Sequence, residues 1–192
     1  MTRLAITTAS VGFTCLIPQN TDKTDVVRRL ALDMPCKRNA ADELKRVAND
    51  FSSFANFEGD FGPVTGLSTF HAKLSFASGA VTPGRNIPIT NTVSNNGGFY
   101  RTSTTVTTSV DVRDVGPYDF TFDTAPDHPF YPGTIQFGTT NMGPAEIKFS
   151  INIYAHFNGT SNWAAFNFLG GGMLETKIWR NLLNNVKQDC AH

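Results

Sequence analysis

The sequence predicts an α+β fold in which a curved antiparallel sheet wraps around a long C-terminal helix, with two shorter helices after the first strand. Two observations predict it: runs of alternating polar and apolar residues fill the second half, and one amphipathic helical pattern closes the chain. A helix that follows a meander of strands can bury its apolar stripe against the sheet, so we expect a cavity between the two. The 192 residues fit a single domain, residues 1–192, with a sizeable core.

The opening of the chain predicts a strand followed by two helices. Leu4–Ile17 is rich in Thr, Val, Ile and Phe, as strands are. Apolar residues at helical spacing between Thr21 and Pro35 predict the first short helix. The second helix is expected to begin at Asn39, which can cap it, and to extend to Phe54.

From Leu67 onward the apolar residues recur at every second position, which is typical of strands with one buried face. Asn95-Asn96-Gly97-Gly98 predicts a tight hairpin turn between two of them. The predicted strands are Leu67–Phe76, Ile87–Val93, Tyr100–Val112, Tyr118–Thr124, Thr134–Gly138 and Glu146–Phe157.

The last predicted helix, Met173–Gln188, places Leu174, Ile178 and Leu182 on one line, with Trp179 beside it. This stripe is expected to face the apolar side of the final strands. We therefore expect an apolar ligand to contact residues of both elements, namely Phe120, Phe122, Phe137, Phe149, Ile151, Ile178, Trp179 and Leu182.

Composition narrows the classes of function. The 16 Phe, against 2 Trp and 4 Tyr, suit either an apolar cavity or a core that simply prefers Phe. Lys and Arg balance Asp and Glu at 16 each, so no global field attracts nucleic acid, and we expect no nucleic-acid partner. No apolar run reaches the roughly 18 residues of a membrane span.

The three cysteines, Cys15, Cys36 and Cys190, are an odd number without metal-ligand spacing. This pattern argues against a disulfide framework and against a zinc site, and one disulfide with one free thiol is the alternative. Leu4–Ile17 is too polar for the core of a signal peptide. Together these features predict a cytoplasmic location.

His128 is the best candidate for acid–base chemistry. It lies in a proline-rich loop that holds Asp127, His128 and Tyr131 near one another. In this hypothesis His128 is the acid or base, Asp127 orients it and Tyr131 donates a hydrogen bond. A rigid turn with His128 bonded to the backbone is the alternative. Strand alternation places His71 and His156 on the polar face.

No cofactor or metal is expected. Gly170-Gly171-Gly172 precedes the last helix, but no strand leads directly into it and no Lys-Ser/Thr follows, so it is not a phosphate-binding loop. The chain also lacks a serine elbow, paired catalytic carboxylates and metal-ligand spacing.

This order of elements resembles the START-like (SRPBCC) superfamily, whose helix-grip fold is shared by polyketide cyclases, birch-pollen-type allergens and lipid-transfer domains. Tyr118–Val186 is also similar to one of its bacterial families of unknown function, with the run Asp119–Thr124 and the turn Asp127-His128-Pro129. Asp127 stands where that family has Gly, and Trp179 and Asn181 replace an Arg-rich run. The resemblance implies a cavity for an apolar small molecule and no fixed cofactor, and it places no catalytic residue.

Three functions follow, in order. The first is binding of a lipid-like or polyketide-like small molecule between the sheet and the C-terminal helix. The second is a cyclase or related biosynthetic enzyme that uses the same cavity. The third is a non-catalytic interaction module. The sequence predicts neither whether the protein is an enzyme nor its oligomeric state.

Overall fold

The computed structural model describes residues 5–8, 13–16, 25–61, 70–95, 102–157 and 171–192. The strands in these ranges are β1 (Ala5–Thr8), β2 (Phe13–Leu16), β3 (Asp25–Pro35), β4 (Phe57–Phe61), β5 (Phe70–Phe76), β6 (Asn86–Asn95), β7 (Thr102–Val115), β8 (Asp119–Thr124), β9 (Gly133–Gly143) and β10 (Glu146–His156). The helices are α1 (Ala40–Asn49), α2 (Phe51–Ala55) and α4 (Gly171–Ala191).

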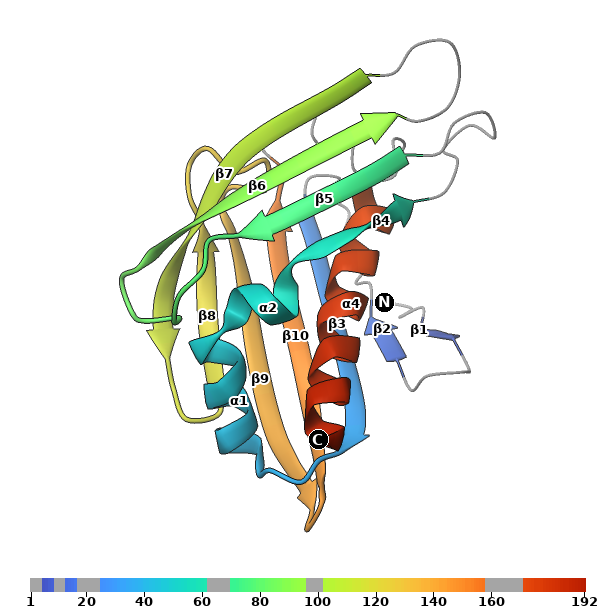
Figure 1. Cartoon of the computed structure of the whole chain (residues 1–192), viewed down its shortest axis with the longest axis vertical. Helices are drawn as coiled ribbons and strands as arrows, with labels where there is room; N and C mark the ends of the chain where they lie inside the picture. The colour runs from blue at the N-terminus through green and yellow to red at the C-terminus, as the bar shows by residue number, and fades with distance from the viewer. Residues whose placement is uncertain (1–4, 9–12, 17–24, 62–69, 96–101, 158–170) are drawn as a thin grey trace.

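Eight strands form one antiparallel sheet in the order β3-β10-β9-β8-β7-β6-β5-β4. The sheet curls strongly, so that β4–β7 lean over the face formed by β3 and β8–β10 (Figure 1). α4 lies in the hollow of this curl, and α1 and α2 cover the same concave side (Figure 1). The predicted fold class, a curved antiparallel sheet wrapped around a long C-terminal helix, is confirmed.

The helix predicted between Thr21 and Pro35 is wrong, because the structure has strand β3 over Asp25–Pro35. β3 pairs with β10 along its whole length, from Asp25 opposite His156 to Pro35 opposite Glu146. Its buried residues follow a period of two, with Leu30, Leu32 and Met34 inside. Apolar residues four positions apart, such as Leu30 and Met34, fit both the helical period and the period of two. Because this segment pairs with β10, it forms a strand.

Two other boundaries differ from the prediction. The first predicted strand, Leu4–Ile17, contains two short strands, β1 and β2, paired antiparallel. Phe57–Phe61, where the sequence analysis predicted no strand, is strand β4 at the edge of the large sheet. The predicted hairpin turn at Asn95–Gly98 extends beyond the described residues after Asn95.

The helix predicted from Asn39 to Phe54 is present as two helices, α1 and α2, separated at Asp50. The Asn39 side chain accepts a hydrogen bond from the Asp42 backbone N–H at 2.9 Å, which caps α1 as expected. α2 places the Phe51 ring in the interior, where only 1% of the residue is exposed.

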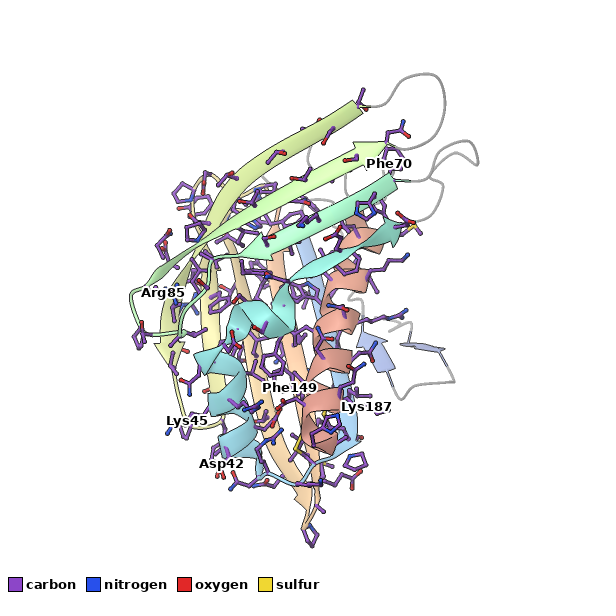
Figure 2. All side chains as sticks on the ribbon, in the orientation of Figure 1. Asp42, Lys45, Phe70, Arg85, Phe149 and Lys187 are labelled. Atoms are coloured by element: carbon purple, nitrogen blue, oxygen red, sulfur yellow. A yellow bond between two sulfur atoms is a disulfide. The ribbon has the colours of Figure 1, made fainter. Side chains whose placement is uncertain are left out.

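Phe51 is the centre of an aromatic cluster. Its ring lies between 5.1 and 5.8 Å from the rings of Phe76, Phe120, Phe122 and Phe137, all edge-on. Figure 2 shows side chains filling the space between α1, α4 and the sheet, where Phe149 is labelled. This end of the interior is packed solid.

A disulfide between Cys36 and Cys190 ties the end of α4 to the segment after β3. One disulfide is the alternative that the cysteine count left open, and the side chain of Cys15 lies outside the described part. Beside the bridge, Arg38 and Arg46 both donate hydrogen bonds to Asp189 of α4. Within the described chain, no helix is long and apolar enough to pass through a membrane.

Candidate functional site

The interior is hollow at the end away from α1. A cavity of about 520 Å³ lies between the curled strands and α4. Most of the side chains around it are apolar, and they come from β5 to β10, from the loop after β8 and from α4. The lining residues are Leu74, Phe76, Ile89, Asn91, Val106, Thr108, Val110, Phe122, Thr124, Pro126, Asp127, His128, Pro129, Phe130, Ile135, Ile153, Tyr154, Ala155, Phe157, Leu174, Glu175, Ile178 and Trp179.

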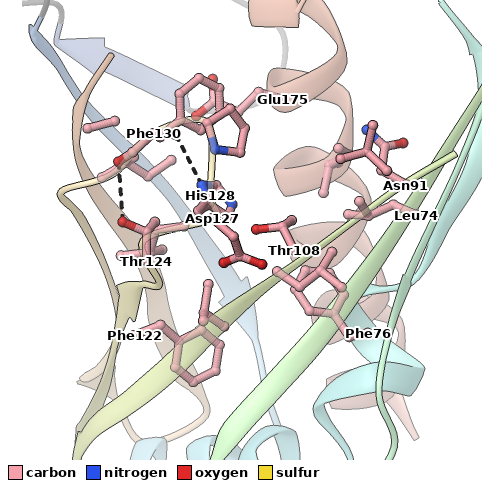
Figure 3. A pocket seen from close by; sticks show the side chains of 18 of the residues that line it. Leu74, Phe76, Asn91, Thr108, Phe122, Thr124, Asp127, His128, Phe130 and Glu175 are labelled. Carbon is pink, nitrogen blue, oxygen red and sulfur yellow. Dashed lines mark hydrogen bonds between the residues drawn. The ribbon is translucent and has the colours of Figure 1, made fainter. Parts of the chain in front are cut away.

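Strand alternation explains most of this wall. Ile89, Val110 and Phe122 occupy the inward positions of neighbouring strands, and all three are buried. Figure 3 shows Phe122 and Phe76 at one end of the cavity and His128, Phe130 and Glu175 at the other. The cavity therefore has an aromatic floor and a more polar upper end.

The loop between β8 and β9 is held by hydrogen bonds across its base. The Thr124 hydroxyl accepts from the Gly133 backbone N–H at 2.7 Å. A Cβ at Gly133 would lie 2.5 Å from the Phe130 carbonyl oxygen, so this close approach requires glycine. The Phe130 ring packs against Phe157, with centroids 5.4 Å apart. The Tyr131-Pro132 peptide bond in this loop is cis.

His128 lines the cavity as an uncharged imidazole. Its Nδ1 accepts a hydrogen bond from the Phe130 backbone N–H at 3.2 Å, which assigns the proton of the neutral ring to Nε2 (Figure 3). Burial lowers the pKa of His128 to about 4, against a small opposing effect of the Asp127 charge. At neutral pH His128 therefore presents an N–H donor.

The three residues predicted for acid–base chemistry are only partly brought together. Asp127 and His128 both line the cavity, but no hydrogen bond joins their side chains among the described contacts. Tyr131 is 40% exposed and is not part of the lining. The His128 ring bonds the backbone, as in the alternative of a rigid turn.

The predicted ligand contacts divide in the same way. Phe122, Ile178 and Trp179 line the cavity. The other five are fully buried in the solid part of the core and are not in the lining: Phe120, Phe137, Phe149, Ile151 and Leu182.

Glu175 is a cavity residue that the sequence analysis missed. It forms an ion pair with Arg28 of β3, which also donates hydrogen bonds to Thr176 Oγ1 at 3.0 Å and to the Gly172 carbonyl at 3.3 Å. Burial raises the pKa of the Glu175 carboxyl, while Arg28 and the Trp179 indole N–H act in the opposite direction. Its sequence signal was a single acid beside the apolar stripe of α4, one turn before Trp179.

One cluster in the described chain has residue types that bind metals. The ligand atoms of Cys36, Glu43 and Cys190 lie within 4.8 Å of one another, and all three residues are buried. The two sulfur atoms are joined in the disulfide, so they are not available as thiolate ligands. This cluster is at the solid end of the core and does not belong to the cavity.

Solved structures with a similar fold have little sequence in common with this chain. Protein Ms6760 from Mycobacterium smegmatis is 10% identical, with a TM-score of 0.52 over 90% of this chain and 93% of that one. A protein from Arthrobacter aurescens is 10% identical, with a TM-score of 0.50 over 94% of this chain and 90% of its own. Human STARD10 is 11% identical, with a TM-score of 0.40 over 99% of this chain and 76% of its own.

No family model matches the chain, and no curated protein matches it either. The local resemblance to a bacterial family of unknown function therefore has no matching family model behind it. At about 10% identity, the likeness to solved structures concerns the fold alone. With its curled antiparallel sheet closed by α4, the chain has the START-like, helix-grip fold.

Proposed function

We propose that this protein binds a hydrophobic small molecule, lipid-like or polyketide-like, in the cavity between the sheet and α4. The observation that carries the proposal is the cavity itself. Its volume of about 520 Å³ lies in the range of small-molecule sites, roughly 300–1,000 Å³, and its wall is mostly apolar with a few polar groups.

The solid end of the same core supports this proposal. Phe51 packs there edge-on against four neighbouring rings. Protein interiors are generally close-packed, and a void of several hundred cubic ångströms loses many favourable van der Waals contacts. A bound apolar molecule would restore those contacts.

Val110 and Val112 provide a matched pair of variants. Both are inward-facing residues of β7 and each is 2% exposed, but only Val110 lines the cavity. We expect Val110→Phe to fill space and to weaken binding of the neutral dye Nile red at least tenfold, with little loss of stability. Val112→Phe should overpack the solid part, at a cost of about 1–3 kcal/mol, and leave dye affinity unchanged.

Fluorescence titration gives the dissociation constants, and urea unfolding gives the free energies. Native mass spectrometry of protein purified from its own cells should also show an additional apolar mass. No saturable dye binding by the wild type, or equal affinities for both variants, would contradict the proposal.

A second candidate is an enzyme of the cyclase type that uses the same cavity. The observation that favours it is that two groups with shifted pKa values, His128 and Glu175, line the cavity. In this proposal the neutral His128 ring donates a hydrogen bond from Nε2 to a substrate oxygen, and Asp127 and Tyr131 assist. His128→Asn should abolish product formation from a poly-keto substrate panel, measured by mass spectrometry, while the far-UV spectrum stays unchanged. Unchanged turnover would exclude His128.

The cytoplasmic location predicted from the sequence stays a proposal. The Cys36–Cys190 disulfide argues against it, because disulfides persist mainly in oxidising compartments. Alkylation of intact cells before lysis tests it. Trapping both cysteines as thiols supports the cytoplasm, and protection of both supports an oxidising compartment.

A further inference from the structure

Buried polar atoms without partners are concentrated at the cavity. In the described part of the chain, four buried side-chain polar atoms have no hydrogen-bond partner: Glu43 Oε1, Asn91 Oδ1, Thr108 Oγ1 and Trp179 Nε1. Three of these residues, Asn91, Thr108 and Trp179, line the cavity. Folded proteins pair nearly all of their buried polar groups, so three such atoms around one void favour a ligand that brings a polar group of its own.

These atoms come from two opposite walls. Asn91 of β6 and Thr108 of β7 face inward on neighbouring strands, and the register, which pairs Asn91 with Val106 and Ile89 with Thr108, makes them diagonal neighbours. Trp179 belongs to α4 on the other side, one turn after Glu175. Asn91, Thr108 and Glu175 lie on the side of the cavity away from Phe122 (Figure 3).

Among the described residues, no acceptor meets hydrogen-bond geometry with the Trp179 indole N–H. It lies near enough to Glu175 to favour the charged carboxylate, but it does not meet hydrogen-bond geometry with that group. His128 adds a second donor, because Nδ1 is already used by the Phe130 N–H and Nε2 carries the proton. The cavity thus offers at least two N–H donors, one hydroxyl and one amide oxygen.

The charges around the cavity disfavour an acidic ligand. Among the described residues, the lining contains the carboxyl groups of Asp127 and Glu175 but no Lys or Arg. Arg28, the cation nearest to Glu175, already binds Glu175, Thr176 and the Gly172 carbonyl. A carboxylate or phosphate placed in the cavity would face carboxyl groups without a cation of its own.

We infer that the ligand is an uncharged hydrophobic alcohol or phenol, whose hydroxyl group pairs with Thr108, Asn91 and the Trp179 N–H, and not a fatty acid or a phospholipid. A hydroxyl both donates and accepts, so it can satisfy the Asn91 oxygen and an N–H donor together. This inference rests on the proposed function, because it specifies the chemistry of the molecule in the same cavity.

Three probes that share one ring system test the inference: 1-pyrenebutanol, 1-pyrenebutyric acid and 1-butylpyrene. Energy transfer from tryptophan to pyrene gives a dissociation constant for each at pH 7.4. We expect the alcohol to bind about tenfold more tightly than the other two, since one net hydrogen bond is worth about a factor of ten.

Two variants of nearly unchanged shape identify the partners. Thr108→Val and Asn91→Leu should each weaken binding of the alcohol about tenfold and leave butylpyrene within a factor of two. Both should raise the melting temperature of the ligand-free protein, because each removes a buried group that has no partner.

Thr139→Val is the matched control. Thr139 is 5% exposed and Thr108 is 7% exposed, but the Thr139 hydroxyl donates to the Ala40 carbonyl at 2.9 Å and lies outside the cavity. This variant should lower the melting temperature and leave all three affinities unchanged.

The outcomes separate the two proposals. Equal affinity for all three probes, or tighter binding of the acid, overturns the inference and leaves the apolar site intact. Failure of all three probes to bind overturns the proposed function, and the inference with it. A melting temperature lowered by Thr108→Val as much as by Thr139→Val overturns the assignment of Thr108 as an unpaired group.

Discussion

The two ends of this core use one sheet and one helix, but one end is solid and the other is hollow. At the solid end, Phe51 reaches from α2 into the concave face and meets four aromatic rings. At the hollow end, the walls carry shorter side chains such as Ile89, Val110 and Thr108, and the space of about 520 Å³ lies between them. The apolar inner face of the sheet therefore does not create a cavity by itself, because the same face is filled by side chains at the solid end.

The two ends differ in how far helices cover the concave face of the sheet. α1 and α2 cover the concave face over β8 and β9 (Figure 1). The side chain of Phe51 packs there against Phe120 and Phe137. Toward β5–β7 the sheet curls away, and among the described elements only α4 and the loop after β8 face the hollow. Four predictions probe this difference, in order of decreasing effect.

The largest effect is expected at Phe51. Phe51→Ala removes the ring at the centre of the solid end and should lower the free energy of unfolding by about 3–5 kcal/mol, measured by urea denaturation. Phe130→Ala, at the hollow end, is the comparison. Phe130 is only half-buried and already borders a void, so Phe130→Ala should lower the free energy of unfolding clearly less than Phe51→Ala does. Equal losses would mean that the two ends are packed alike.

The disulfide should stabilise the solid end without affecting the cavity. Cys36 and Cys190 are 154 residues apart in sequence, and their bridge restricts a long loop of the unfolded chain. The double variant Cys36→Ala/Cys190→Ala should lose about 2–4 kcal/mol of stability and keep its Nile red affinity, because neither residue lines the cavity. A reducing agent should destabilise the wild type and leave the variant unaffected. Loss of dye binding in the variant would show that the two ends are coupled.

Local pattern predicted the fold well wherever one period dominated. The strands from β5 to β10 and the helix α4 were expected from alternation and from helical spacing. β3 was missed, because its apolar residues fit both periods and its partner, β10, is more than a hundred residues away in the chain. The pairing of Cys36 with Cys190 is equally long-range, so their spacing carried no signal.

The cavity residues were harder to predict than the elements that carry them. Phe120 and Phe122 are on the same face of the same strand, yet only Phe122 lines the cavity. Parity assigns a residue to the inner face, but the distance to the opposite wall depends on the curl of the sheet and on α2. Glu175 was missed for a similar reason, since its ion pair is with Arg28 of the strand that had been predicted as a helix.

The hollow end should be sensitive to acid through His128. Its pKa is about 4 in the folded protein and 6.5 in the unfolded chain, so the unfolded state binds the proton more readily between these values. The stabilising contribution is complete above pH 6.5 and is lost as the pH falls to 4, by about 3 kcal/mol at most. Urea unfolding at pH 7.5 and pH 4.5 measures the difference.

His128→Asn should remove this part of the pH dependence, because an asparagine oxygen can still accept from the Phe130 N–H. His71→Asn is the control. Its pKa is raised, chiefly by the hydrogen bond that its ring donates to the Asp60 carboxylate, so its contribution is present below pH 6.5 and is lost as the pH rises. A pH dependence that His128→Asn leaves unchanged would contradict the neutral, buried imidazole.

The smallest effect is expected at the cap of α1. Asn39→Ala leaves the Asp42 backbone N–H without its acceptor and should cost about 1 kcal/mol, whereas Asn39→Ser keeps an acceptor and should cost less. Because α1 covers the solid end, neither variant should change the Nile red affinity. A change in that affinity after the loss of one cap would show that α1 influences the cavity, and that the solid end holds the walls of the hollow end apart.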